Sequence, residues 1–325
     1  MPQGQLAQVL RVVAPAADSP ALLAGPDSFD DVGAVRLGDG RVGLHTVDFF
    51  PPVVDDAAAY GAVAAANSLS DIYAAGGEAK VVLNLAGFPE EWGDDILQPL
   101  FAAAVEKVQE AGALWVGGHS VRAAEPLFGF AVYGEVAEED LVTNSGAKPG
   151  DLLFLSKPLG SGCITTGVKR EQTEAAEVEA AVAGMARLNL GTAKAMRAAG
   201  VKAATDVTGF GLLGHAANIA RASGVRMEIE AAALPLYPGA ARLAQAGVFS
   251  GASARGARNL EAEVQVAPGV DEWLAKLGFD AETSGGLLIC VPEERVAALH
   301  EAMPAGEELT AVGRVEAGDS GVRLS

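Results

Sequence analysis

The stretch Thr205-Asp206-Val207-Thr208-Gly209-Phe210-Gly211-Leu212-Leu213-Gly214-His215 decides the fold around it. Glycines at 209, 211 and 214 let the backbone turn tightly and let a ligand approach, and the apolar, alanine-rich run that follows predicts a helix. The free N–H groups at a helix start suit a phosphate. A carboxylate at this turn would repel that phosphate unless a cation lay between them. Asp206 is therefore interpreted as a metal ligand at a nucleotide-phosphate site; the alternative is an Asp that caps the helix.

The composition bounds the class of protein. The 325 residues, half of them hydrophobic, suffice for about two domains with sizeable cores. No run of about 18 uncharged apolar residues predicts a membrane helix, and residues 1–4 do not open a signal peptide. A net charge of −19 argues against non-specific nucleic-acid binding. Cys163 and Cys290 lack CxxC spacing, which favours buried reduced thiols; a cytoplasmic location is expected.

The chain begins with a short predicted helix and a strand pair. Apolar residues at helical spacing predict a helix over residues 2–14. The polar turn Asp30-Asp31 leads into a strand, and another strand is expected over 41–47. Asp48 follows at its end, where sites in α/β proteins usually lie.

An alanine-rich helix is predicted over residues 56–75. It carries Asn67 and Asp71 four positions apart, and therefore on one face. Because a buried charge without a partner is costly, the pair predicts a ligand or metal on that face. The alternative is a polar surface stripe.

Further elements of the first half are expected as strands over 79–86, 113–117 and 127–136 and a helix over 95–112. The second of these strands leads into Gly117-Gly118-His119-Ser120, a predicted small-residue loop that could wrap a phosphate or sugar. The turn-rich stretch 143–150 predicts a linker. We therefore place the domains at 1–145 and 146–325.

The second half also mixes strands and helices. Strands are expected over 151–155, 224–230, 287–292 and 309–316, and helices over 174–199, up to about 222 and over 293–303. Arg258-Asn259 is expected in irregular structure. Lys157 precedes a glycine-rich turn, but the order of a Walker loop is absent. Without regular βαβ repetition, the pattern favours two α+β domains over one doubly wound sheet.

Six phrases carry a resemblance to a known family. They are Asp30-Asp31, Thr46-Val47-Asp48-Phe49-Phe50, Asn67-Ser68-Leu69-Ser70-Asp71-Ile72-Tyr73, Gly117-Gly118-His119-Ser120, the opening stretch 205–215, and Thr283-Ser284-Gly285-Gly286-Leu287. In this order and spacing the chain resembles the selenophosphate synthetases (selenide, water dikinases) over nearly its whole length. The wider superfamily includes aminoimidazole ribonucleotide synthetase, thiamine-monophosphate kinase and a hydrogenase maturation protein.

The resemblance implies ATP-dependent formation of selenophosphate from selenide, with AMP and orthophosphate as the other products. It also implies the two-domain α+β fold of aminoimidazole ribonucleotide synthetase, with N-terminal domains that pair through their sheets in a homodimer. Neither nucleic acid nor membrane is an expected partner.

The resemblance also assigns site residues. The positions that match magnesium ligands are Asp31, Asp71 and Asp206. The positions that match ATP-binding residues are Ser28, Phe29, Asp30, Asp48, Asn67, Asp71, Gly118, His119 and Ser120. Residues 118–120 are expected to reach the nucleotide of the partner subunit, and K⁺ is a further candidate cation.

The chemistry of three gathered carboxylates agrees with this assignment. Two such charges about 4 Å apart repel by roughly 4 kcal/mol at an effective dielectric constant near 20. The cluster is therefore stable mainly when divalent cations share it, and Mg²⁺ prefers carboxylate and phosphate oxygens. Mg²⁺ can also spread the charge that develops as a phosphoryl group moves.

The sequence departs from the family at one place. The family carries a reactive Cys or selenocysteine and a Lys in a segment that would precede Met1, so no catalytic residue is assigned in this chain. Neither Cys163 nor Cys290 is expected to replace the nucleophile, since a reactive thiol needs exposure and a lowered pKa.

Three explanations of this departure compete: a misassigned start, a shortened chain, or a natural form that binds ATP without completing the reaction. The last would be a regulatory or partner subunit. A sister-family enzyme with another acceptor is a further alternative.

Overall fold

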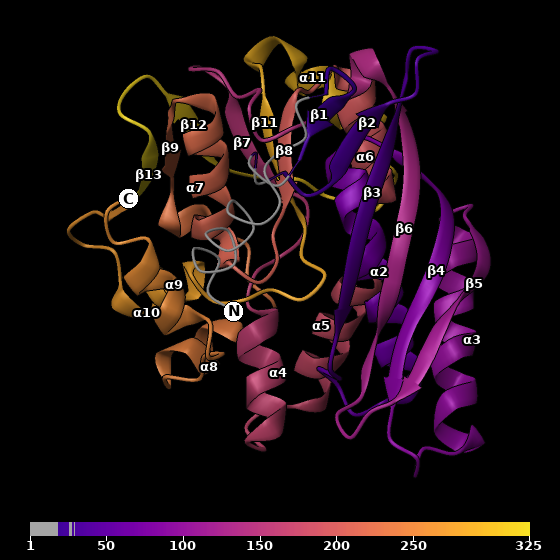
Figure 1. The fold of residues 1–325 in the computed structure, drawn as a ribbon. Helices are drawn as coiled ribbons and strands as arrows, with labels where there is room; N and C mark the ends of the chain where they lie inside the picture. The colour runs from indigo at the N-terminus through magenta and orange to yellow at the C-terminus, as the bar shows by residue number, and fades with distance from the viewer. Residues whose placement is uncertain (1–18, 26–27, 29) are drawn as a thin grey trace.

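The computed structural model describes residues 19–25, 28 and 30–325 (Figure 1). The helix expected over 2–14 and the predicted ATP-binding residue Phe29 lie outside these residues. The described chain folds into two α+β halves, each built on one sheet. Helix α2 (Ala57–Ala74) lies between the halves.

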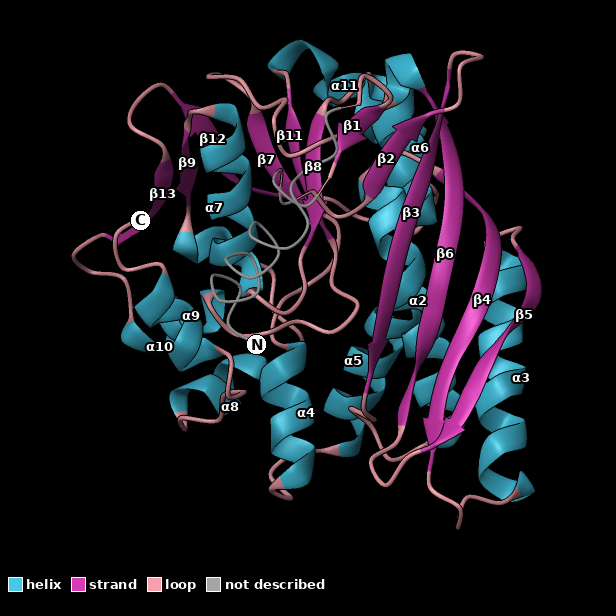
Figure 2. Cartoon of the chain, viewed as in Figure 1, coloured by secondary structure: helices cyan, strands magenta, loops and turns pink. Residues whose placement is uncertain are grey.

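The first half contains a six-stranded sheet in the order β1-β2-β3-β6-β4-β5. Its strands are β1 (Leu22–Ala24), β2 (Gly33–Arg36), β3 (Arg41–Phe50), β4 (Glu78–Phe88), β5 (Leu114–Arg122) and β6 (Leu127–Ala137). Neighbours are antiparallel except β4 and β5, which are parallel and are joined through helix α3 (Asp94–Glu110), as a parallel connection requires. Helices α2 and α3 cover one face of this sheet (Figure 2).

The second half contains a seven-stranded sheet in the order β10-β13-β9-β12-β7-β11-β8. Its strands are β7 (Leu152–Leu155), β8 (Ala203–Asp206), β9 (Arg226–Ile229), β10 (Val264–Val266), β11 (Leu287–Val291), β12 (Thr310–Glu316) and β13 (Gly321–Leu324). Its helices are α4 (Ser161–Lys169), α5 (Ala175–Ala186), α6 (Leu190–Ala199), α7 (Gly211–Ser223), α8 (Ala240–Gln245), α9 (Ser253–Asn259), α10 (Glu272–Gly278) and α11 (Val296–Ala302). Short 3₁₀ turns lie at Glu138–Asp140, Ala231–Ala233 and Glu293–Arg295.

Helix α2 is the element that the two halves share. The Asp56 side chain caps its start by accepting the Ala59 N–H at 2.7 Å, as expected of an N-cap Asp. The helix packs against β3, β6 and α3 on one side and against α5, α6 and β8 on the other. Most of its residues are buried, which explains an alanine-rich sequence with little amphipathic contrast.

Two local expectations were wrong. Residues 117–120 are not a loop, because they belong to edge strand β5. Gly118 permits this pairing, since a Cβ there would lie 2.3 Å from the Asn84 carbonyl oxygen on β4. Arg258-Asn259 ends helix α9 rather than lying in irregular structure. The boundary between 145 and 146 stays a prediction; strand β6 ends at Ala137, and β7 begins at Leu152.

The face of the first sheet opposite α2 and α3 is apolar and exposed. We call it the outer face. Its exposed apolar side chains are Val47, Phe49, Leu83, Leu114, Val116 and Val121. A hollow of about 330 Å³ opens on it, between β3, β4 and β6.

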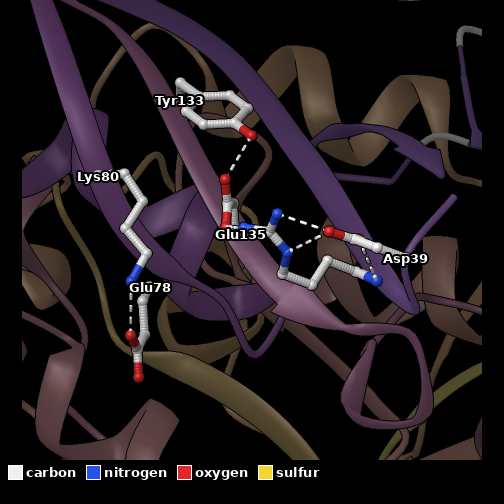
Figure 3. A network of polar contacts seen from close by, with 6 residues as sticks. Asp39, Glu78, Lys80, Tyr133 and Glu135 are labelled. Carbon is white, nitrogen blue, oxygen red and sulfur yellow. Dashed lines mark hydrogen bonds and ion pairs between the residues drawn. The ribbon is translucent and has the colours of Figure 1, made fainter. Parts of the chain in front are cut away.

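A polar network lies at the end of the outer face (Figure 3). Arg41 bridges Asp39 at 2.6 Å and Glu135 at 2.5 Å, and the Tyr133 hydroxyl donates to Glu135. Such exposed ion pairs contribute little stability. Their charged side chains form the polar border of the apolar outer face.

No helix within the described ranges is long and apolar enough to cross a membrane.

Candidate functional site

Three carboxylates from different elements meet where the two halves join. Asp31 precedes β2, Asp71 lies on α2, and Asp206 is the last residue of β8. Burial raises the pKa of both Asp31 and Asp71, and the charge of Asp206 raises each further. The structure therefore brings these three side chains together, while their role as metal ligands stays a prediction.

Asp206 has the least satisfied environment of the three. Its side chain belongs to a residue that is 1% exposed, and Oδ2 has no hydrogen-bond partner. Burial raises the pKa of this carboxyl to about 6. A buried carboxylate oxygen without a partner is costly, and a divalent cation with a preference for oxygen ligands would satisfy it. The donor set thus fits Mg²⁺.

The predicted polar face of α2 contacts strand β3. The Thr46 hydroxyl donates to Asp71 Oδ2 at 2.5 Å, and Asn67 Nδ2 donates to Asp48 Oδ2. Asn67 Oδ1 accepts the Ser284 N–H at 2.8 Å. Asn67 and Asp71 therefore share one face, and Asn67 connects Asp48 to the second half.

The turn at 283–286 is held tightly against α2. Ser284 is fully buried at φ +48°, and its hydroxyl has no partner; such strain is typical of functional sites. Asn189 Nδ2 donates to both Ser70 Oγ and the Gly285 carbonyl, each at 2.9 Å. The turn therefore stands where the two halves meet, near the carboxylates.

Lys157 stabilises this turn through hydrogen bonds to backbone carbonyls and is not a Walker-type lysine. Its Nζ donates to the carbonyls of Ser284 at 2.8 Å and Arg187 at 2.7 Å. Burial lowers its pKa to about 7.

His215 is a site residue that sequence analysis missed. Its ring lies with Asp31 and Asp206 in a group whose possible ligand atoms are all within 4.8 Å of one another. It is buried on α7, and burial lowers its pKa to about 4, so the ring is neutral near pH 7. The sequence did offer one indication: His215 is the last residue of the stretch 205–215, which was already interpreted as a ligand site.

Other predicted residues make contacts with residues outside the carboxylate cluster or lie far from it. Ser28 Oγ donates to the Gly25 carbonyl at 2.9 Å. Asp30 Oδ1 accepts the Asn144 N–H at 2.7 Å. Gly118, His119 and Ser120 are exposed on β5, at the edge of the sheet opposite β1. Their roles in ATP binding stay predictions.

Neither cysteine is suited to nucleophilic chemistry. Cys163 lies in helix α4, and Cys290 lies in β11. Both are fully buried, and burial raises the pKa of each thiol. Cys163 Sγ donates to Asp280 Oδ2 at 3.4 Å, a structural contact.

Two family models match the chain. The model of the AIR synthase related protein N-terminal domain matches residues 29–136, and that of the C-terminal domain matches residues 148–324. The first match covers the first sheet from β2 to β6, apart from the last residue of β6, and the second match covers all seven strands of the second sheet.

Curated relatives match most of the chain. Selenide, water dikinase 2 of Peptoclostridium acidaminophilum is 40% identical over 90% of this chain and 85% of its own. The selenide, water dikinase of Caldanaerobacter subterraneus subsp. tengcongensis is 44% identical over 86% and 80%. That of Myxococcus xanthus is 40% identical over 93% and 87%.

Solved structures share the fold. Thiamine monophosphate kinase from Aquifex aeolicus has a TM-score of 0.71 at 20% identity, covering 99% of this chain and 96% of that chain. The hydrogenase maturation protein HypE in complex with ATP has a TM-score of 0.65 at 18% identity, covering 94% and 87%.

Proposed function

The chain belongs to the selenide, water dikinases of the AIR synthase related family, and we propose that it uses ATP to convert selenide into selenophosphate, with release of AMP and orthophosphate. The observation that carries the proposal is 40–44% identity to these enzymes over 86–93% of the chain. The solved structures quoted above are at most 20% identical and share only the fold, which by itself does not specify an acceptor.

Within this function Asp31, Asp71 and Asp206 would hold magnesium bound to ATP. The unpartnered Oδ2 of Asp206 and the mutual repulsion of the three groups support this role. When bound, Mg²⁺ would neutralise charge on the phosphates. A K⁺ ion stays a prediction, because the described residues single out no site for it.

Asp48 and Asn67 would shape the nucleotide site from the first half. Their hydrogen bond fixes the Asp48 carboxylate, and burial raises the pKa of Asp48. The same Asn67 amide holds the backbone of Ser284. Through Asn67, a shift of the 283–286 turn would also move Asp48, the proposed nucleotide contact of the first half.

A homodimer paired through the outer face is part of the proposal. Leu114 and Val116 are 67% and 58% exposed there, and contiguous exposed apolar surface favours a protein interface. Residues 118–120 lie on β5 beside them and would be available to the nucleotide of a partner subunit. A cytoplasmic location stays a prediction.

The test is AMP formation from magnesium and ATP, with and without selenide, by the chain as it stands. Selenide-dependent AMP together with selenophosphate is the expected result. ADP formed with another acceptor, such as thiamine monophosphate, would indicate a sister-family enzyme. ATP binding without AMP would overturn synthesis by this chain and indicate a regulatory or partner subunit.

A further inference from the structure

The tautomer of His215 is set by the backbone. Nε2 lies 3.1 Å from the Thr208 N–H, which can only donate, so Nε2 accepts that bond. In the neutral ring the proton is then on Nδ1. Nδ1 lies 3.2 Å from the Thr205 hydroxyl oxygen, so the ring donates to Thr205.

The Thr205 hydroxyl accepts the hydrogen bond from His215 and donates its own hydrogen to Asp31. Since Oγ1 receives the ring proton, its own hydrogen points elsewhere. Asp31 Oδ1 lies 2.9 Å away and the Asp206 carbonyl 3.1 Å away. The carboxylate is the stronger acceptor. The chain of donors therefore runs from the backbone-fixed ring through Thr205 to Asp31.

We propose that His215 is a positioning residue of the metal site, which acts through the Thr205 hydroxyl to hold Asp31 facing Asp206. Asp31 is partly exposed and repelled by the Asp206 carboxylate, and it is held by hydrogen bonds from the Thr205 hydroxyl and the Asp206 backbone. Loss of the Thr205 bond would therefore leave the carboxyl less firmly oriented. If the Asp31 carboxyl is already in place before the cation binds, binding does not have to include the entropic cost of ordering this side chain. The inference rests on the proposed metal site.

A direct role of His215 as a metal ligand fits less well. Coordination through Nε2 would leave the partly buried Thr208 N–H without its acceptor, and the loss of that hydrogen bond is a cost. Coordination through Nδ1 would break the contact that orients Thr205. The ring therefore supports a ligand and is not one itself, as is common in the outer shell of metal sites.

Two substitutions of His215 distinguish the donor role of Nδ1 from the acceptor role of Nε2. His215→Asn places an amide N–H where Nδ1 was, so it keeps the donor to Thr205 and loses the acceptor for Thr208. His215→Gln reaches the Nε2 position, so it keeps that acceptor and loses the donor. Thr205→Val removes the intermediate hydroxyl, and His300→Gln on α11 is the control for loss of an imidazole.

Binding of Mn²⁺ alone to the full chain, followed by calorimetry and electron paramagnetic resonance, is the measurement. We expect His215→Gln and Thr205→Val each to weaken Mn²⁺ binding about 10- to 100-fold, the range for outer-shell partners. The double variant should lose no more than either single one, since both break one chain of contacts. His215→Asn should lose less than about threefold, and His300→Gln should match the parent.

Other outcomes would overturn the inference. If His215→Asn binds Mn²⁺ as weakly as His215→Gln does, or more weakly, the ring serves only the Thr208 turn or is itself a ligand. Unchanged Mn²⁺ binding in Thr205→Val would also overturn the positioning role. This substitution changes the shape of the side chain only slightly, so the variant is expected to fold. Asp206→Asn tests the underlying site separately: if it retains full Mn²⁺ binding, the proposed metal site is wrong rather than the positioning role.

Discussion

Asp206, a proposed metal ligand, lies in an environment that costs stability when no cation is bound. It is buried, one oxygen is unpartnered, and its charge raises the pKa of Asp31 and Asp71. A site selected for stability alone would not gather three acidic groups without a cation. Perturbed titration together with such geometry favours a functional role.

Asp206→Asn is expected to abolish metal-dependent ATP turnover, by at least about 100-fold, while the protein still folds. The amide keeps the shape but removes one charge, so in EDTA the variant should be more stable by about 1 kcal/mol, a fraction of one like-charge repulsion. Turnover at saturating magnesium and thermal unfolding measure the two effects. Asp319→Asn, at an exposed position, is the matched control. Parent-like turnover in Asp206→Asn would contradict the assignment.

The sequence was sufficient for the carboxylates but not for their supports. Asp71 stands one helical turn from Asn67, and Asp206 stands before a glycine-rich turn, so local patterns single them out. His215 acts through Thr205, and an alternating or helical pattern carries no sign of a hydrogen bond between side chains. Glu282 contacts Ser161 from 121 positions away, a distance over which spacing predicts nothing.

Among the elements, helix α4 begins on a carboxylate supplied by a remote loop. Glu282 accepts the N–H groups of Gly160 at 2.6 Å and Ser161 at 2.9 Å, and also the Ser161 hydroxyl. An acidic group at a helix N-terminus satisfies free donors and the helix dipole. Burial nevertheless raises the pKa of Glu282 to about 7. The loop that carries the 283–286 turn is anchored in this way.

This anchor predicts a pH dependence of stability. The folded-state pKa of Glu282, about 7, lies above the ordinary value of 4.5, so its contribution is complete below pH 4.5 and is lost as the pH rises through 7. Each unit of pH in that window costs up to about 1.4 kcal/mol. Glu282→Gln should therefore flatten the decline in unfolding free energy between pH 4.5 and 7, as measured by urea titration.

Below pH 4.5 the same substitution should lower stability by about 1–3 kcal/mol, because an amide NH₂ group cannot accept from a backbone N–H, and this deficit should shrink as the pH rises toward 7. Glu301→Gln, on the exposed side of α11, should leave the pH profile unchanged. A profile of Glu282→Gln as steep as that of the parent would assign the decline to other groups.

Long elements followed from the sequence and short ones did not. The predicted strands at 41–47 and 127–136 and the helix at 56–75 correspond to β3, β6 and α2 because each spans several periods of its pattern. Strand β3 continues to Phe50, so Asp48 lies within the strand rather than after its end, paired with Phe130 on β6. Strands β1 and β10 have three residues each, too few for any periodicity to register. Strand β5 was cut short at Gly117, since two glycines indicate a turn unless a neighbouring strand requires their small size.

At the scale of the whole molecule, the outer face predicts a dimer that one charge would break. Val116→Glu places a carboxylate within this apolar surface, so the dissociation constant of the proposed dimer should rise at least about 100-fold, equivalent to roughly 3 kcal/mol. Sedimentation velocity measures it. Val266→Glu on β10, a similarly exposed valine of the second half, is the control. A dimer that persists in Val116→Glu would place the interface elsewhere.

Helix α2 has a consequence for how the chain unfolds. It is packed by β3 and β6 from one side and by α5, α6 and β8 from the other, so neither half can keep a complete core after the other has melted. The two halves are therefore expected to lose their structure together. Scanning calorimetry should show a single endotherm whose calorimetric and van't Hoff enthalpies agree, although the chain carries two sheets that could be taken for independent folding units.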